Sequence, residues 1–251
     1  MTSQASSAPP ALAEDEIHIW TIDLRPQSGL SSAENDLSED EIRRANAFHF
    51  PRDRKRFVRC RSSVRTILGH YVSMDPSRVQ FDYGPRGKPA LTGQAPNQQV
   101  CFNVSHSGDL AVIALTLNRS IGVDVEELRT DSDLESIAEK FFSPRERAAL
   151  EALSPSARDR AFFLCWTRKE AYVKASGDGL ARALDQFDVS LNADGPIELV
   201  TRPDLAEAAR WSLYNLTLDA HYAAAVAVQG SQLRLKVCND TQESVRSNVT
   251  L

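Results

Sequence analysis

The sequence predicts an α+β protein made of two similar halves, because one helical pattern occurs twice and strand-like runs accompany both copies. The first copy begins at Leu37-Ser38-Glu39-Asp40-Glu41 and the second at Phe142-Ser143-Pro144-Arg145-Glu146. An Arg-Asp-Arg triplet follows each copy, at 52–54 and at 158–160, and then an apolar-periodic stretch. Chance could produce the likeness, but the nearly equal offsets, both about 105 residues, favour an internal duplication.

Each copy carries a signal for the start of a helix. Ser38 with Glu41, and Ser143 with Glu146, fit the capping box, in which each side chain binds the other residue's backbone N–H. Pro144 stands at the first helical position, where proline is favoured. We therefore expect helices directly after both serines.

Strands are predicted where residues alternate between apolar and polar or form short apolar runs. The ordered chain is expected to begin with such a strand over 16–22, because its residues alternate. Further predicted strands are Val100–Val104, Leu110–Leu117, Ile121–Glu126, Phe187–Leu191, Trp211–Leu218 and Tyr222–Val228. Asn118-Arg119-Ser120 predicts a tight turn between two of them.

These elements predict four parts of the chain. Residues 1–14, rich in Ser, Ala and Pro, are expected to be disordered, and the polar residues 239–251 to be a flexible tail. Between them, 15–118 is the predicted N-terminal half and 119–238 the predicted C-terminal half. A ligand site between the two halves is the natural expectation.

Composition narrows the class of protein. With 251 residues, a net charge of −5 and 42% hydrophobic residues, the chain is typical of a globular protein rather than a general nucleic-acid binder. No segment has the pattern of a signal peptide or is apolar for long enough to span a bilayer. The four cysteines show no C-x-x-C spacing, so zinc is not expected. We expect a cytoplasmic protein that binds neither nucleic acid nor membrane.

The sharpest chemical feature is the segment Ile121-Gly122-Val123-Asp124-Val125-Glu126. In a strand, Asp124 and Glu126 point to the same side, roughly 7 Å apart, with Gly122 leaving room beside them. Two close carboxylates repel each other unless a cation lies between them, and a hard divalent cation prefers such oxygen ligands. An exposed strand end with two solvated acids is the alternative.

A second feature is an acid and a base on one predicted helix. Glu170 and Lys174 are an i,i+4 pair on the face that also holds Trp166. Their partly apolar surroundings are unlike those of a purely solvated pair, but taken alone the spacing favours an ordinary helix salt bridge.

A third feature is a strand that ends in small polar residues, Asn103-Val104-Ser105-His106-Ser107-Gly108-Asp109. Ser105, His106 and the backbone N–H groups of such a turn can hold phosphate oxygens. A serine–histidine nucleophile pair would need a third orienting group, which the sequence does not reveal. A plain hydrogen-bonded turn is the alternative.

Basic residues gather in two places. In the loop Tyr83-Gly84-Pro85-Arg86-Gly87-Lys88-Pro89, the two cations could face phosphates and Pro89 could pack against a base, or the loop could simply be solvated. The stretch 43–65 holds many arginines, most of which we expect on solvated helix faces. One or two of them could bind a terminal phosphate.

Taken in order, these segments resemble the surfactin-synthetase type of 4′-phosphopantetheinyl transferase. The resemblance rests on Gly87-Lys88-Pro89, Asn103–Ser107, Gly122–Glu126, Phe141–Glu146 and Trp166-Thr167-x-Lys169-Glu170-Ala171-x-x-Lys174, and extends from about residue 37 to about 180. It implies a pseudo-twofold α+β monomer with coenzyme A between the halves. It also implies Mg²⁺, with Mn²⁺ as the alternative, and an acyl or peptidyl carrier protein whose serine receives the phosphopantetheine arm.

The resemblance assigns expected roles to individual residues. Asp124, Glu126 and Glu170 match the magnesium ligands, Glu170 also matches the general base, and Lys174 matches the cation at the reacting phosphates. The residues matching coenzyme contacts are Arg44, Arg86, Gly87, Lys88, Pro89, Asn103, Ser105, His106 and Lys174. The segment around Arg44 aligns loosely. Catalysis is thus expected to depend on Glu170, Lys174 and His106.

Two other functions fit some of the same residues. A non-catalytic coenzyme A or nucleotide-binding module could keep such a pocket, but the acidic and basic set argues against it. A magnesium-dependent nucleotidyl transferase or hydrolase could use the same ligands. No Walker-type G-x-x-x-x-G-K-[ST] run supports an ordinary ATPase.

Overall fold

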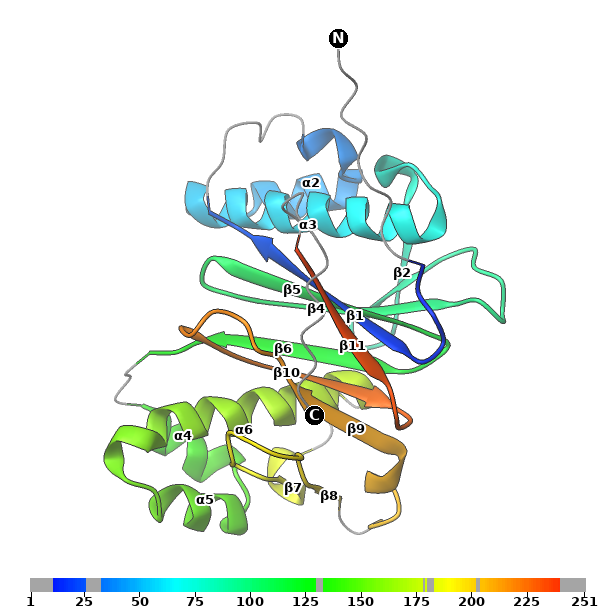
Figure 1. The fold of residues 1–251 in the computed structure, drawn as a ribbon. Coiled ribbons are helices and arrows are strands. Elements are labelled where there is room, and N and C mark those ends of the chain that lie inside the picture. The colour runs from blue at the N-terminus through cyan, green and yellow to red at the C-terminus, as the bar shows by residue number, and fades with distance from the viewer. Residues whose placement is uncertain are drawn as a thin grey trace.

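The described residues form two larger β-sheets that lie face to face, each covered on its outer side by helices, and two small two-stranded sheets. The computed structural model describes residues 11–25, 33–129, 133–177, 179, 183–201 and 204–239. Of the predicted tails at 1–14 and 239–251, residues 1–10 and 240–251 lie outside the described residues, whereas 11–14 are described as they lead into β1 (Glu16–Asp23). Figure 1 shows the four layers: α2 and α3, the first sheet, the second sheet, and then α4, α5 and α6.

The N-terminal half supplies most of the first sheet, whose strand order is β11-β1-β5-β4. Its elements are β1 (Glu16–Asp23), α2 (Glu39–Asn46), α3 (Pro51–Val72), β2 (Phe81–Tyr83), β3 (Pro89–Leu91), β4 (Val100–Ser107) and β5 (Leu110–Leu117). The long helix α3 packs on this sheet through Val64, Ile67 and Leu68, which share one buried cluster with Ile113 and Leu115 of β5.

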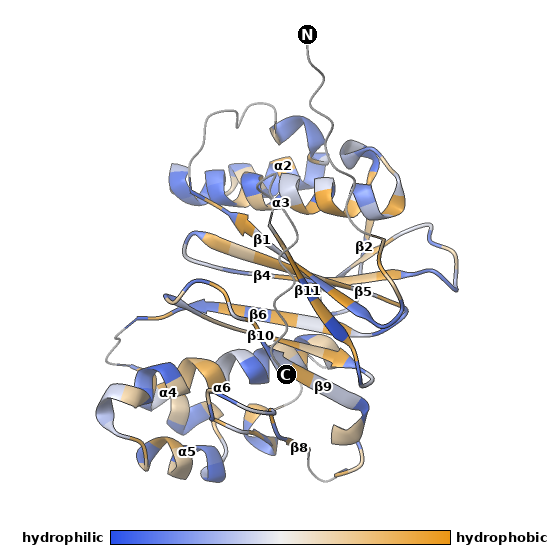
Figure 2. Ribbon diagram, in the orientation of Figure 1, coloured by the Kyte–Doolittle hydropathy of each residue, from blue (hydrophilic) through white to orange (hydrophobic). Residues whose placement is uncertain are grey.

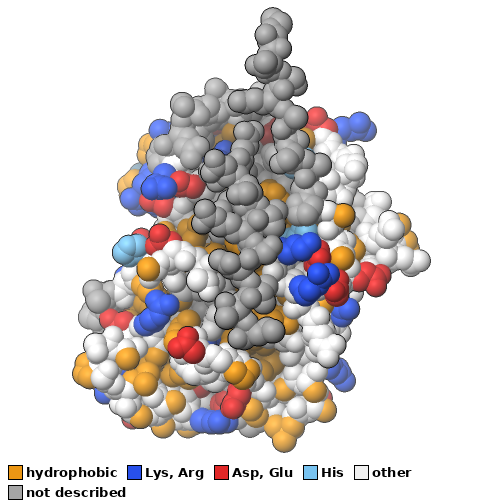
Figure 3. Space-filling view, viewed as in Figure 1, with side chains coloured by type: hydrophobic (Ala, Val, Ile, Leu, Met, Phe, Trp, Pro, Cys, Tyr) orange, Lys and Arg blue, Asp and Glu red, His pale blue; other side chains and the backbone are white. Residues whose placement is uncertain are grey.

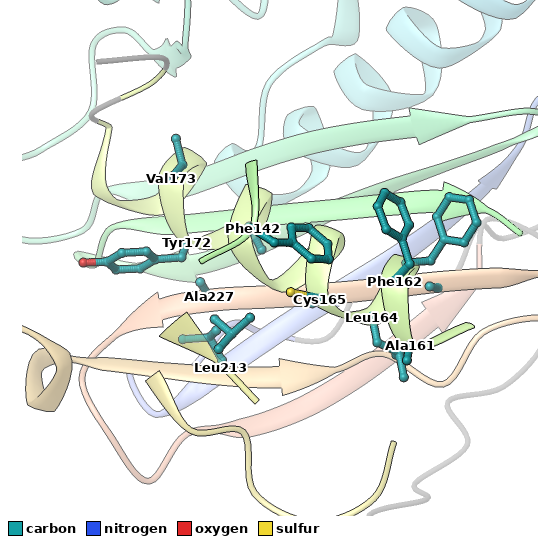
Figure 4. Close-up of a cluster of buried hydrophobic side chains, with 14 of the residues drawn as sticks. Phe142, Ala161, Phe162, Leu164, Cys165, Tyr172, Val173, Leu213 and Ala227 are labelled. Atoms are coloured by element: carbon teal, nitrogen blue, oxygen red, sulfur yellow. The ribbon is translucent and has the colours of Figure 1, made fainter. Parts of the chain in front are cut away.

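The second sheet has the strand order β6-β10-β9. The elements of this half are β6 (Ile121–Glu127), α4 (Leu134–Phe141), α5 (Pro144–Glu151), α6 (Pro155–Ser176), β7 (Phe187–Val189), β8 (Leu199–Thr201), β9 (Trp211–Asn215) and β10 (Tyr222–Gln229). Figure 4 shows the core beneath this sheet, where aromatic residues such as Phe162 and Tyr172 of α6 lie among Leu213 and Ala227 of the strands.

A separate core fills the space between the two sheets. Ile17 and Ile19 of β1 and Val112 of β5 face Val123 of β6 and Val226 of β10, and all five are fully buried. The hydropathy colouring in Figure 2 shows the resulting pattern, with apolar strands in the middle layers and hydrophilic residues on the outer helices. Alternation along the strands therefore lets each sheet serve two cores, one on each face.

The two halves repeat the same helical unit, as the sequence predicts. Both capping boxes form, with Ser38 N donating to Glu41 at 3.0 Å and Ser143 N donating to Glu146 at 2.9 Å. The following helices, α3 and α6, have 22 residues each and begin with a proline. Both capping glutamates are buried and pair with a cation of the long helix. Glu41 accepts from Arg65 at 2.6 Å and Glu146 from Lys169 at 2.7 Å.

The end of the described chain returns to the N-terminal sheet. Strand β11 (Arg234–Asn239) runs parallel to β1, with Arg234 opposite Glu16 and Lys236 opposite His18. The sequence analysis placed its last strand at Tyr222–Val228 and did not find this one. The helices among the described residues include none that is long and apolar enough to cross a membrane. In the view of Figure 3, cationic and acidic side chains lie intermixed on the described surface.

A buried carboxylate fastens β11 to β1. Glu16 forms ion pairs with Arg234 at 3.0 Å and with Lys236 at 2.8 Å, and a hydrogen bond with His18 at 3.0 Å. Burial by itself would raise the pKa of Glu16, but the hydrogen bonds, led by that of Lys236, outweigh it and lower the pKa to about 2. Because this pKa is below that of the unfolded chain, the charged carboxylate stabilises the fold above about pH 4.5.

We expect Glu16→Gln to lower the free energy of unfolding by about 2 kcal/mol at pH 7, because a charged hydrogen-bond acceptor is lost. The difference in the free energy of unfolding between variant and wild type should narrow as pH falls from about 4.5 towards 2, where Glu16 becomes protonated in the wild type. Urea denaturation at several pH values measures this difference. Glu198→Gln is the control, because Glu198 forms an exposed ion pair with Arg145. A gap of equal size at pH 7 and pH 2 would contradict the assignment.

Candidate active site

The predicted metal ligands and catalytic residues lie where the edges of the two sheets meet. Strand β4 is the edge of the first sheet and β6 the edge of the second, and we call their line of contact the seam. Across it, Asn103 Oδ1 accepts from the N–H of Val123 at 2.9 Å, and Ser105 Oγ donates to Asp124 Oδ1 at 2.9 Å. Side chains thus take the place of a backbone ladder between these edge strands.

Asp124 is the most buried of the predicted metal ligands. It is 3% exposed, and its Oδ1 accepts from Lys174 Nζ at 2.6 Å as well as from Ser105. Its other oxygen, Oδ2, is buried and has no hydrogen-bond partner among the described residues. Burial raises the pKa of Asp124, and Lys174 and Ser105 only partly counter it. An unpaired carboxylate oxygen in a buried place is costly unless a cation or donor completes it.

Glu126 and Glu170 add negative charge around Asp124. Burial is the main cause that raises the pKa of each, and the charge of Asp124 raises both further. Glu126 also raises the pKa of Glu170. No three His, Cys, Asp or Glu side chains within the described ranges converge closely enough to form a ready-made metal site. The carboxylates are therefore neighbours that influence one another rather than a closed ligand cage.

Helix α6 reaches these carboxylates because β6 has a glycine at the point of contact. A Cβ atom on Gly122 would lie 2.2 Å from the carbonyl oxygen of Ala171 and 2.3 Å from the N atom of Ala175. The sequence analysis expected Gly122 to leave room beside the carboxylates, and the structure fills that room with the backbone of α6. The close approach brings Lys174 within hydrogen-bond distance of Asp124.

Lys174 and His106 are the cation and the imidazole nearest to this group. Lys174 Nζ also donates to Ser105 Oγ at 3.1 Å and to the carbonyl of Val123 at 3.3 Å. His106 reaches solvent, yet partial burial lowers its pKa, and the charges of Lys174 and Arg56 lower it further. A neutral imidazole beside a lysine can donate one hydrogen bond to an anion at neutral pH.

The basic loop joins the two halves. Lys88 Nζ donates to the carbonyls of Ile121 at 2.8 Å and Lys174 at 2.6 Å, and Arg86 donates to the carbonyl of Gly177 at 2.7 Å. The Ile121 carbonyl lies at the start of β6. The carbonyls of Lys174 and Gly177 lie at the C-terminal end of α6, where the helix dipole favours cations. Two donors of Lys88 are thus engaged in holding the seam, and its predicted contact with the coenzyme stays a prediction.

The remaining predicted coenzyme contacts lie at several places. Gly87 has a positive φ of 77° in the turn before β3, which Pro89 begins. Asn103 is buried and its Oδ1 is engaged with β6. Arg44 lies on α2 with its guanidinium 5.6 Å from the ring centre of Phe57, and the structure does not bring it to the carboxylates.

Ser107 belongs to the predicted motif Asn103–Asp109, but no role was predicted for it. Ser107 Oγ donates to Glu126 Oε2 at 2.9 Å and accepts from the N–H of Glu127 at 3.1 Å. The signal was present, because Ser105 and Ser107 have the same spacing as Asp124 and Glu126. No local pattern indicates, however, that two strands from different sheets lie side by side.

Comparison with known proteins identifies the family of this site. The model of the 4′-phosphopantetheinyl transferase superfamily matches residues 120–227, and an N-terminal 4′-phosphopantetheinyl transferase model matches residues 25–118. The 4′-phosphopantetheinyl transferase HetI of Nostoc sp. is 44% identical over 220 residues, which cover 87% of this chain and 90% of that protein. The chain belongs to the 4′-phosphopantetheinyl transferase superfamily.

More distant relatives agree with this assignment. The protein slr0495 of Synechocystis sp. is 32% identical over 216 residues, covering 84% of this chain and 83% of that protein. The 4′-phosphopantetheinyl transferase Sfp of Bacillus subtilis is 31% identical over 175 residues, covering 68% and 75%. The resemblance to this family is therefore confirmed, and so is the prediction that the chain is an enzyme, a transferase. The roles of its individual residues are not decided by these matches.

We expect Gly122→Ala to destabilise this transferase by about 2 kcal/mol, because the new methyl group would overlap backbone atoms of α6 that cannot turn aside. The melting temperature should fall accordingly. Gly84→Ala is the matched control, because a Cβ there would meet only the carbonyl of Lys88 at an ordinary 3.7 Å. Equal melting temperatures for the Gly122 variant and the wild type would show that α6 and β6 are not closely packed.

Proposed function

We propose that this enzyme transfers the 4′-phosphopantetheine arm of coenzyme A to a serine of an acyl or peptidyl carrier protein, releasing 3′,5′-ADP. The observation that carries the proposal is the buried Asp124 with its unpaired Oδ2, placed beside Glu126, Glu170 and Lys174. Such a site has negative charge to bind a divalent cation and a fixed positive charge for phosphate oxygens.

Mg²⁺ or Mn²⁺ fits the side chains present. The donors available are carboxylate oxygens, which hard divalent cations prefer. The unpaired Oδ2 of Asp124 offers a buried ligand atom. Burial and then the charge of Asp124 raise the pKa values of Glu126 and Glu170, so a nearby cation would stabilise their charged forms. Asp124, Glu126 and Glu170 would hold the ion, whose chemistry is to neutralise charge on the diphosphate of coenzyme A.

In the reaction, the carrier serine oxygen forms a new bond to the phosphorus that bears the pantetheine arm. The bond between that phosphorus and the oxygen bridging to 3′,5′-ADP breaks, and 3′,5′-ADP leaves. Glu170, the carboxylate beside Asp124 and Lys174, takes the serine proton as general base. Lys174 and the neutral His106 donate to phosphate oxygens as charge shifts to the leaving group.

The pairing of Lys174 with Asp124 has a consequence for this mechanism. With hydrogen bonds to Asp124, Ser105 and the Val123 carbonyl, all three ammonium protons of Lys174 are engaged. The bond to the Val123 carbonyl is the longest of the three at 3.3 Å and is the least costly to exchange. Lys174 therefore reaches a phosphate oxygen most easily by giving up that bond.

The test is to incubate the enzyme with an apo carrier protein, coenzyme A and Mg²⁺, and to weigh the intact carrier by mass spectrometry. We expect a mass gain of one phosphopantetheine, and no gain when EDTA removes the metal. No gain on either an acyl or a peptidyl carrier would contradict the proposed acceptor. Release of a coenzyme A fragment without a modified carrier would indicate a hydrolase with water as the acceptor.

We expect Glu170→Gln to reduce transfer at least about 100-fold while the protein stays folded, because the amide can neither take a proton nor bind a cation as a carboxylate does. Circular dichroism and the melting temperature check the fold. Glu139→Gln is the matched control, because Glu139 is an exposed residue of α4. Near-wild-type turnover of the Glu170 variant would rule out both of its proposed roles.

A further inference from the structure

Two serines on β4 face two carboxylates on β6 with the same spacing. Ser105 Oγ donates to Asp124 and Ser107 Oγ donates to Glu126, both at 2.9 Å. Successive residues of a strand point to opposite faces, so residues two apart share a face on both β4 and β6. The seam therefore holds a pair of parallel serine–carboxylate contacts, of which the Ser107 contact has no role in the mechanism above.

The direction of each hydrogen bond at Ser107 is fixed by its partners. The N–H of Glu127 can only donate, so Ser107 Oγ accepts from it at 3.1 Å. The carboxylate of Glu126 accepts, so the single hydroxyl proton of Ser107 points to Oε2. Ser105 is arranged likewise, because it accepts from Lys174 and donates to Asp124. Neither hydroxyl is free to turn without losing a bond.

The turn after Ser107 lies beside the side chains of Glu127 and Tyr222. Gly108 has a positive φ of 55°, and a Cβ there would lie 2.4 Å from Glu127 Oε2 and 3.2 Å from the hydroxyl of Tyr222. The glycine thus allows the left-handed turn and leaves room for the ends of these side chains. Ser107, just before the turn, lies within hydrogen-bond distance of both the Glu127 N–H and the Glu126 carboxylate.

Glu126 needs such support more than Asp124 does. It has one more rotatable bond and is only half-buried, whereas Asp124 is buried and held by Lys174 and Ser105. Among the described residues, Ser107 is the hydrogen-bond partner seen for the Glu126 side chain. Ligands that are oriented in advance by outer hydrogen bonds bind a metal ion more tightly than ligands that must be ordered on binding.

We propose that Ser107 is a positioning residue whose hydroxyl holds one oxygen of Glu126 and so orients this carboxylate towards a divalent cation bound with Asp124. The proposal rests on the proposed function, because it assumes that Glu126 is a metal ligand. Ser107 itself would touch neither the metal ion nor the substrates.

The experiment is a titration of the full-length enzyme with Mn²⁺ in the presence of coenzyme A, followed by electron paramagnetic resonance, with a blank of coenzyme A alone. We expect Ser107→Ala to weaken Mn²⁺ binding about tenfold. Ser107→Thr keeps the hydroxyl and should restore the affinity to within about twofold of the wild type. Ser212→Ala is the control. Ser212 lies on β9, outside the seam, and donates to the carbonyl of Gly230, so its removal should leave the Mn²⁺ affinity unchanged.

A double-mutant cycle separates positioning from a general loss of structure. If Ser107 acts through Glu126, Ser107→Ala should have little further effect on Mn²⁺ affinity in the Glu126→Gln background. An unchanged affinity of Ser107→Ala, or equal losses in both backgrounds, would overturn the positioning role while leaving the proposed function intact. Absence of Mn²⁺ binding by the wild type would instead overturn the metal-dependent function together with the positioning role.

Discussion

The arrangement of the site depends on one buried carboxylate, that of Asp124. A carboxylate at this depth loses its hydration and is tolerated only if charged or polar groups replace the water. Lys174 comes from α6 and Ser105 from β4, while Asp124 itself lies on β6. Satisfying this single residue therefore requires a strand of the first sheet, a strand of the second sheet and a helix beneath it to meet at one place.

Small residues make that meeting geometrically feasible. Helix α6 lies against β6 at Gly122, and it packs on β10 through Ala223, Ala225 and Ala227, which belong to the same buried cluster. Larger side chains on these strands would hold α6 further away, and the 2.6 Å contact between Lys174 and Asp124 would be lost. Packing volume far from any reacting atom thus determines the distance between the acidic and basic groups.

Much of this fold could be predicted from the sequence because the signals are local. The capping boxes at Ser38 and Ser143 and the strand Leu110–Leu117 depend on residues a few positions apart, and the structure confirms them. Strand β11 was not found, although Leu233, Leu235 and Val237 alternate with Arg234 and Lys236. Its partner strand β1, with Glu16, lies more than 200 residues earlier in the chain, and no local pattern reveals that partner.

The site was predictable to a similar extent and for the same reason. Asp124 and Glu126 share a face because they lie on one strand, and Glu170 and Lys174 share a face because they lie on one helix. That Lys88 would use its donors on the carbonyls of Ile121 and Lys174 could not be inferred, because a sequence does not show which backbone groups a long side chain will reach. Contacts within one element follow from its period, whereas contacts between elements follow only from the packed fold.

The two similar halves supply different groups to the proposed reaction. Counted from the first proline of α3 and of α6, Arg65 and Lys169 occupy the same position, and each pairs with the buried glutamate of a capping box. The next equivalent positions differ, since Thr66 corresponds to Glu170 and His70 to Lys174. The repeated ion pair fixes each long helix against its neighbouring short helix and has the same structural task in both halves. The acid and the base that follow it in α6 lie one helical turn apart, and α3 lacks both. Only the C-terminal half therefore supplies the proposed general base and lysine, whereas β4 of the N-terminal half supplies His106.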